Sequence, residues 1–176
     1  ANACVGWMRG GMAMVNIVAS YFFGGISGSA SADTASLGSI LIPMMVDQGY
    51  DGDFSTAVTI TSSCEGLLVP PSHNMVIYAM SAGGISVGSL FLAGYLPGAL
   101  LAVSLMVGSY IISKKRHYPK GEKFSFKALL KQIGVSIWAL AAVVIVVVGV
   151  VAGWFTATES AAIAVFYSLI VSVYIY

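Results

Sequence analysis

The sequence predicts an all-α polytopic membrane protein, and three observations lead to this fold class. Of the 176 residues, 58% are hydrophobic and only 9% are charged, whereas charged residues make up about a quarter of a soluble domain. No Asp, Glu, Lys or Arg occurs from Gly66 to Ser113. The apolar stretches also lack the strict alternation of a membrane β-barrel, so helices must satisfy the backbone in lipid.

A re-entrant helical hairpin is expected at residues 11–47, after an interfacial helix at residues 1–10. Two apolar arms flank a polar tip of glycines and serines at residues 24–33. Each arm is predicted to reach roughly 20 Å, which is less than the roughly 30 Å of a bilayer core. Ser31 or Asp33 is expected to cap the second arm, because either side chain offers an oxygen to the first amides of the helix.

A discontinuous transmembrane helix is expected at residues 48–83. Two consecutive prolines interrupt it within residues 65–72, because proline lacks the amide that a helix needs. A second re-entrant hairpin is the alternative, and the distribution of basic residues decides against it. Arg9 and the seven basic residues of 114–131 lie on one side of the membrane only if this segment crosses once.

The remaining chain is predicted to contain two membrane crossings and the start of a third. Residues 84–113 form a transmembrane helix and residues 114–131 a basic cytoplasmic linker. Residues 132–155 form the next transmembrane helix. A further transmembrane helix starts within residues 156–176, where the sequence Thr-Ala-Thr-Glu fits a capping box.

The tip of the hairpin and the break of the discontinuous helix together predict a polar site near the middle of the membrane. Helix C-terminal carbonyls and hydroxyl oxygens suit a hard cation such as Na⁺, and helix N-terminal amides suit a carboxylate. Secondary transporters commonly hold a coupling ion and an anionic substrate in this way. Residues with polar side chains at these helix ends are the candidates for substrate binding: Ser29, Asp33, Glu65, Ser72, His73 and Asn74.

Each candidate also has a purely structural interpretation. The serines of the tip could cap helices or allow close helix packing. Asp33 could be only a helix cap, and Glu65 could lie in a water-filled vestibule without binding anything. His73 and Asn74 could cap the helix that resumes after the prolines.

Two other function classes are kept as alternatives. The string Gly-Ile-Ser-Gly at 25–28 looks like the serine motif of rhomboid intramembrane proteases, and a Ser27–His73 dyad is conceivable. The residues around His73 lack the rhomboid histidine pattern, which argues against this function. An accessory structural membrane subunit with no solute path would tolerate Asp33→Ala and Ser29→Ala without effect.

Four motifs occur in order along the chain: Gly-Ser-Ala-Ser-Ala-Asp at 28–33, Leu-Gly-Ser-Ile-Leu-Ile-Pro-Met-Met at 37–45, Val-Pro-Pro-Ser at 69–72 and Leu-Pro-Gly at 96–98. Together these motifs resemble the large membrane subunit of TRAP (tripartite ATP-independent periplasmic) transporters. The resemblance implies a non-enzymatic, Na⁺-coupled importer of organic acids such as dicarboxylates, without an organic cofactor, in the inner membrane of a bacterium or archaeon. It also implies an elevator mechanism and two partners, a small membrane subunit and an extracytoplasmic solute-binding protein.

The resemblance further implies which residues bind Na⁺ and which part of the inverted-repeat fold this chain holds. The family's sodium contacts map onto the tip and the break: Ser27, Gly28, Ser29, Ser31, Ser63, Gly66 and Pro70. The chain would contain the first hairpin and broken helix and the opening of the second repeat. One departure is Glu65, because the family usually has an isoleucine before the glycine at this point. His73 and Asn74 are a second departure, since they replace a more apolar pair.

Overall fold

A computed structural model describes residues 8–120 and 126–174, and this part of the chain is helical apart from turns and one bridge between Arg9 and Lys120. The interfacial helix expected at residues 1–10 lies mostly outside the described residues, and residues 8–10 are not helical. The helices are α2 (Gly11–Ser27), α3 (Ala30–Asp47), α4 (Gly52–Ser63), α5 (Glu65–Leu68), α6 (His73–Ser81), α7 (Val87–Lys115), α8 (Phe126–Val151) and α9 (Ala157–Tyr174).

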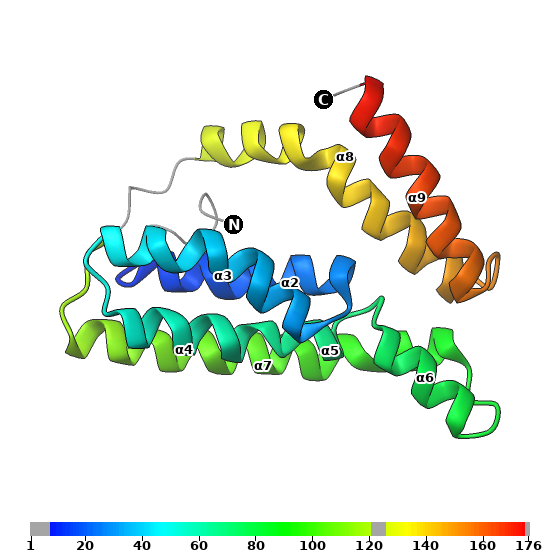
Figure 1. Cartoon of the computed structure of the whole chain (residues 1–176), viewed down its shortest axis with the longest axis horizontal. Coiled ribbons are helices and arrows are strands. Elements are labelled where there is room, and N and C mark those ends of the chain that lie inside the picture. Colours follow the sequence, from blue (N-terminus) through cyan, green and yellow to red (C-terminus); the bar gives the residue numbers. More distant parts are fainter. Residues whose placement is uncertain (1–7, 121–125, 175–176) are drawn as a thin grey trace.

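Helices α2 and α3 form a hairpin that turns at Gly28 and Ser29 (Figure 1). The polar tip predicted at 24–33 is shorter than expected, because both helices continue into it. Gly28 ends α2 in the left-handed conformation, with φ 60°, and donates its amide to the Gly24 carbonyl at 2.8 Å. The helices contain 17 and 18 residues, or roughly 25 Å each, so neither is long enough for a bilayer core of about 30 Å.

The discontinuous helix consists of α4, the single turn α5, and α6. Its break is at residues 69–72 rather than at 65–72, because Glu65–Leu68 is helical. In Figure 1 these three helices follow one another along α7, and all three contact it. The chain therefore continues in one direction across the break instead of doubling back. That this segment crosses a membrane stays a prediction.

Helix α7 is longer than the transmembrane helix expected at 84–113, since it extends to Lys115 and has 29 residues. Among the described residues it is the one helix that length and composition alone qualify to cross a bilayer. Its exposed surface is apolar, with Leu96 80% and Leu100 68% exposed. This surface is suited to contact with lipid or with another membrane subunit.

Helices α8 and α9 form a second pair of contacting helices (Figure 1). Helix α7 ends at Lys115 and α8 begins at Phe126, so the segment between them is shorter than the linker predicted at 114–131. The predicted capping box at the start of α9 is confirmed. The Thr156 amide donates to the Glu159 carboxylate at 2.8 Å, and the Glu159 amide donates to the Thr156 hydroxyl at 3.3 Å.

The base of the hairpin, opposite its tip, holds an apolar and aromatic core. It is formed by Met12, Ala13, Ile17, Leu41, Met45, Tyr50, Phe54, Val58 and Tyr118. The ring of Tyr118, which follows α7, lies 4.6 Å from that of Tyr50 and 5.2 Å from that of Phe54. Because Tyr118 is far along the chain, these contacts attach the end of α7 to the base of the hairpin.

An ion pair on the surface reinforces this attachment. The Arg116 guanidinium contacts the Asp51 carboxylate, and the Tyr118 hydroxyl donates to the same carboxylate at 2.6 Å. The hydrogen bond from Tyr118 and the one from Arg116 hold the pKa of Asp51 below its ordinary value. The base of the hairpin is thus closed by paired, solvent-exposed charges.

Candidate functional site

The tip of the hairpin meets the discontinuous helix through direct backbone contact. A Cβ atom on Gly24 would lie 2.7 Å from the Gly66 Cα, and one on Gly28 would lie 3.1 Å from the Pro71 carbonyl oxygen. A Cβ on Gly25 would lie 3.0 Å from the Pro70 carbonyl oxygen. Only glycine permits such close approach of two backbones. The predicted proximity of the tip and the break is therefore present in the structure.

A pocket of about 340 Å³ lies beside this contact. Its polar wall comes from the tip and the break, and its apolar wall from α7, α8 and α9. The lining residues are Ser27, Gly28, Pro71, Ser72, His73, Val76, Phe91, Val146, Val150 and Ala164. A concave, mostly apolar pocket with a few convergent polar groups is typical of small-molecule sites.

The first turn of α6 borders this pocket at His73 and Val76. Ser72 precedes the helix but does not cap it, since its hydroxyl donates to the Leu67 carbonyl at 3.0 Å. Ser72 thus gives the first amides of α6 no side-chain bond. Such amides carry partial positive charge and favour an anionic group.

The residues expected to contact substrate fall into separate groups. Ser72 and His73 line the pocket. Asp33 and Glu65 do not belong to its lining and are 0% exposed. Asn74 is exposed on α6. The structure does not bring these candidates into one site.

Ser29 caps α3, since its hydroxyl accepts from the Ala32 amide at 3.5 Å. The prediction that Ser31 or Asp33 caps this helix is wrong, because the helix begins at Ala30. Ser31 is exposed, with its hydroxyl 3.1 Å from that of Ser29. Asp33 is in the first turn of α3 and faces the interior.

The residues mapped as sodium ligands lie on both sides of the contact between tip and break. Ser27, Gly28, Ser29 and Ser31 are at the tip, and Ser63, Gly66 and Pro70 are on the discontinuous helix. A Cβ on Gly66 would lie 3.6 Å from the Ser29 amide nitrogen, so these two parts touch. Ser63 is buried, and its hydroxyl donates to the Thr59 carbonyl at 2.8 Å.

Five fully buried polar residues between α2 and α4 form what we call the polar seam: Asn16, Ser20, Thr59, Ser62 and Ser63. The Asn16 amide donates to the Thr59 hydroxyl at 2.7 Å, and the Ser20 and Ser62 hydroxyls are 3.0 Å apart. All but Ser63 were missed in the sequence analysis. Their spacing could have revealed them, because Asn16 and Ser20 are four residues apart and share one helix face.

Asp33 and Glu65 extend the polar seam toward the tip. The hydroxyls of Ser20 and Ser63 lie near the Asp33 carboxylate, and the charges of Asp33 and Glu65 interact. All four oxygens of these two carboxylates are buried without a hydrogen-bond partner in the described part of the chain. Buried carboxylates without hydrogen-bond partners are costly, so Asp33 and Glu65 stay candidates for a functional role.

The geometry does not form the Ser27–His73 dyad. Both residues line the pocket, but the Ser27 hydroxyl bonds with the backbone of Ser29, at 3.3 Å from its amide and 3.4 Å from its carbonyl. A serine nucleophile needs a base within hydrogen-bond reach of its hydroxyl.

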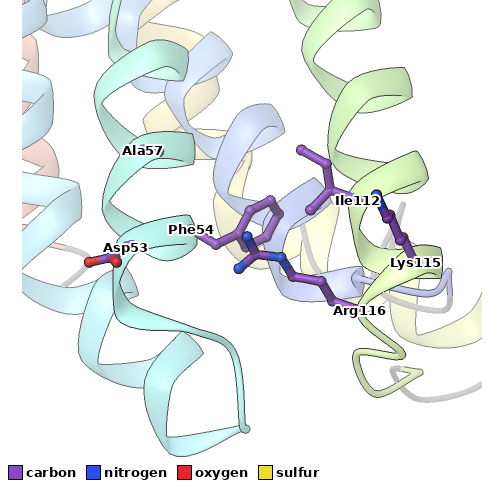
Figure 2. A pocket seen from close by; sticks show the side chains of 6 residues that line it. All are labelled: Asp53, Phe54, Ala57, Ile112, Lys115 and Arg116. Carbon is purple, nitrogen blue, oxygen red and sulfur yellow. The ribbon is translucent and has the colours of Figure 1, made fainter.

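A second pocket of about 640 Å³ lies at the other end of the bundle, between α4 and α7. Figure 2 shows Phe54 and Ile112 facing each other across it, with Arg116 reaching toward Phe54 and Asp53 turned away. Arg116 is already paired with Asp51. The pocket is thus lined by the apolar residues Phe54, Ala57 and Ile112 and by the charged residues Asp53, Lys115 and Arg116.

Discontinuous helices that end around a substrate pocket are common in the class of secondary transporters. The family model of the tripartite ATP-independent periplasmic transporter DctM component matches residues 1–176. The chain belongs to this family, whose members are membrane permeases that form one component of a tripartite transporter.

Similar proteins cover the full range of this chain. It is 42% identical over 176 residues to the sialic acid TRAP transporter permease protein SiaT of Haemophilus influenzae, covering 100% of the chain and 28% of that protein. It is 41% identical to the C4-dicarboxylate TRAP transporter large permease protein DctM of Pseudomonas aeruginosa, covering 100% and 41%. The uncharacterized protein YgiK of Salmonella typhimurium is 43% identical over 96% of the chain and 39% of its own length. The chain thus spans less than half the length of these relatives.

Proposed function

We propose that this chain is the part of a Na⁺-coupled secondary importer that holds the first hairpin and the discontinuous helix. The importer moves organic acids across the inner membrane of a bacterium or archaeon by an elevator-type alternating-access mechanism. Membership of the DctM family supports transport. The observation that carries the proposal is the contact of Gly28 with residues 71–73 beside a pocket of about 340 Å³.

The substrate's carboxylate binds at the first turn of α6. The amides there, which the N-cap residue Ser72 does not bond, favour an anion, and His73 supplies a hydrogen-bonding group on the same pocket. Apolar side chains from α7, α8 and α9 contact the rest of the molecule. The names of the relatives, which include a sialic acid permease and a C4-dicarboxylate permease, support a carboxylate as the common feature of the substrates.

The coupling Na⁺ binds at the tip, where hard oxygen ligands gather. Residues 28 and 29 lie between α2 and α3. The Ser29 carbonyl accepts from the Asp33 amide at 3.0 Å, whereas the Gly28 carbonyl belongs to neither helix. The Ser27 hydroxyl accepts from the Ser29 amide at 3.3 Å, so the two serines lie together at the tip. The backbone of Gly66 contacts Ser29 from the discontinuous helix. Carbonyl and hydroxyl oxygens at this spacing fit a sodium ion, and Ser31, Ser63 and Pro70 complete the proposed ligand set.

The complete transporter has two further components, a small membrane subunit and an extracytoplasmic solute-binding protein. The tripartite nature of the family supports this proposal. The exposed apolar surfaces of α7, at Leu92, Leu96 and Leu100, are available for a membrane partner or for lipid. A second hairpin and proline break are expected in the part of the full-length protein outside this chain, because inverted repeats are common in such transporters.

Uptake into proteoliposomes tests the proposal. The full-length protein with its partners is expected to accumulate an organic acid only when a Na⁺ gradient is imposed. Ser27→Ala is expected to raise the Na⁺ concentration needed for half-maximal uptake, since it removes one oxygen ligand. Uptake that is indifferent to Na⁺ would contradict the coupling. An unchanged rate in both Asp33→Ala and Ser29→Ala would favour an accessory subunit without a solute path.

A further inference from the structure

The second pocket, between α4 and α7, combines an apolar wall with a cationic edge. Its volume of about 640 Å³ is within the range of about 300–1,000 Å³ that is typical of ligand sites. Phe54 and Ala57 line it from α4, and Ile112 lines it from α7. Lys115 and Arg116 line it where α7 ends. Such a pocket is suited to a molecule with an anionic head and an apolar tail.

The length of α7 places this pocket at the depth of a phospholipid headgroup. The helix has 29 residues, or roughly 44 Å, which matches the roughly 40–45 Å of a bilayer with its headgroup layers. Lys115 is the last residue of the helix. A helix of this length that spans the bilayer has its last turn among the headgroups. The basic residues of 114–131 are predicted to face the cytoplasm, where the membrane surface carries anionic lipids.

Lys115 supplies a positive charge that no carboxylate neutralises. The ion pair between Arg116 and Asp51 is the one salt bridge in the described part of the chain, so Lys115 has no acidic partner there. Asp53 also lines the pocket, but its carboxylate is turned away from Phe54 and Arg116 (Figure 2). The α7 side of the pocket therefore attracts an anion.

Arg116 keeps hydrogen-bond donors for the same anion. Its contact with Asp51 and its 3.4 Å bond to the Tyr118 hydroxyl both come from Nη1. A guanidinium group has five N–H donors, so those of Nη2 and Nε are without a partner in the residues that the structure describes. The group reaches toward Phe54 across the pocket (Figure 2). The planar donors of arginine match the oxygens of a phosphate.

The apolar wall continues from the pocket along α7 toward the middle of the predicted bilayer. Gly108 lies one helical turn before Ile112, and nothing lies within 4 Å of a Cβ at Gly108. Val107, beside it, and Ile112 are both exposed. Open space next to exposed apolar side chains is suited to an acyl chain.

We propose that this pocket binds an anionic phospholipid. Its phosphate contacts Lys115 and Arg116, and one acyl chain lies between α4 and α7 against Phe54 and Ile112. The inference goes beyond the proposed function, because neither Na⁺ nor the organic acid takes part in it. A lipid bound in this way joins the start of α4 to the end of α7 and stabilises the base of the hairpin.

Thermal melting of the full-length protein in detergent tests the inference with three probes. Dioleoyl phosphatidylglycerol is anionic and is expected to raise the melting temperature until the site is saturated. Dioleoyl phosphatidylcholine has the same acyl chains with a zwitterionic headgroup, and glycerol phosphate has the anion without the chains. Neither is expected to stabilise the protein at the same concentration. Equal stabilisation by either of them overturns the proposal, because the site would then recognise only acyl chains or only an anion.

Lys115→Gln separates the pocket from the general positive charge of this surface. The concentration of phosphatidylglycerol that gives half of the stabilisation is expected to rise about fivefold, which is the usual contribution of one basic residue near an anionic membrane surface. Lys114→Gln is the matched control, because Lys114 is the preceding residue of the same helix, is exposed, and does not line the pocket. Equal effects of the two substitutions would assign the binding to surface charge and overturn the pocket.

Ala57→Leu tests the apolar part without changing any charge. The larger side chain fills space between α4 and α7, so binding of phosphatidylglycerol is expected to weaken. Thr56→Leu is its control, since Thr56 is the exposed neighbour on α4 and does not line the pocket. An unchanged lipid response in Ala57→Leu, with a lowered melting temperature in lipid-free detergent, would show that another segment of the protein fills the pocket and would overturn the inference. The Na⁺ dependence of uptake is measured separately, so a failure here leaves the proposed function standing.

Discussion

The carboxylates at the two ends of the hairpin differ in burial and in hydrogen bonding. At the base, the exposed Asp51 carboxylate accepts hydrogen bonds from Arg116 and from Tyr118. Toward the tip, the fully buried Asp33 and Glu65 carboxylates accept none within the described residues. Solvent reaches the charges at the base, whereas Asp33 and Glu65 are 0% exposed.

This difference shows that the two ends serve different purposes. Burial makes an unpartnered charge costly, so a region selected only for stability would pair its buried charges first. The base follows that rule with aromatic packing and an ion pair. The region near the tip violates it, which is expected where binding a ligand, rather than folding, determines the residues.

The largest expected effect comes from separating the tip from the discontinuous helix. In Gly24→Val the new side chain would clash with the backbone of Gly66, because its Cβ alone would lie 2.7 Å from the Gly66 Cα. Backbone atoms cannot move aside as a flexible side chain can, so we expect loss of uptake and a destabilisation of up to about 3 kcal/mol. Melting temperature and proteoliposome uptake measure both effects.

Gly108→Val is the control for this substitution, because nothing lies within 4 Å of a Cβ at that position of α7. It should retain both uptake and stability. Wild-type uptake by Gly24→Val would show that close contact at the tip is not needed for transport.

An intermediate effect is expected within the polar seam. Thr59→Val keeps the shape of the side chain but leaves the buried Asn16 amide without the oxygen to which it donates at 2.7 Å. An unsatisfied buried donor costs about 1–3 kcal/mol, which chemical denaturation or thermal melting can detect. Thr61→Val is the matched control, since Thr61 is exposed on the same helix and its hydroxyl bonds only with its own backbone turn. Equal stability changes in the two variants would mean that the polar seam does not depend on this bond.

The smallest effect concerns acid stability at the base. The pKa of Asp51 is lowered from its ordinary value of 3.8, chiefly by the hydrogen bond from Tyr118. A carboxyl group with a lowered folded-state pKa contributes stability above its ordinary pKa and loses it as the pH falls through the folded value. Tyr118→Phe keeps the ring but removes this bond and the bonds that the hydroxyl accepts from the Asp51 amide at 3.3 Å and from Arg116 at 3.4 Å, so it should lower the melting temperature slightly at neutral pH. The difference from wild type should shrink in acid as the Asp51 carboxylate is protonated, and a difference that is the same at both pH values would contradict a contribution from the carboxylate.

Much of the architecture could be predicted because its causes are local. The proline pair, the glycines of the tip and the capping box at Thr156 each act on neighbouring residues, so their effects can be inferred from the printed sequence. Boundaries were less accurate. The single turn α5 adds Glu65–Leu68 after α4 ends at Ser63, and α3 begins at Ala30, because a helix extends wherever tertiary contacts favour it.

The site was harder to predict than the fold. Asp33 was a candidate cap and substrate ligand, but the packing of α2, α3 and α5 encloses it beside Glu65. The polar seam was almost wholly missed, since serine and threonine are common in membrane helices and a single one carries little information. Only the spacing of Asn16 and Ser20 pointed to a shared face.

The sequence by itself determined that this protein is helical and suited to a membrane, where its helices are interrupted, and which family it resembles. These properties follow from composition and from residues such as Pro70 and Gly28 whose backbone chemistry acts locally. Only the tertiary structure decided that Asp33 and Glu65 lie together without donors, while His73 lines a separate pocket. Burial and pairing depend on residues that are distant in the chain, and the packing of α2, α3 and α5 brings those residues together.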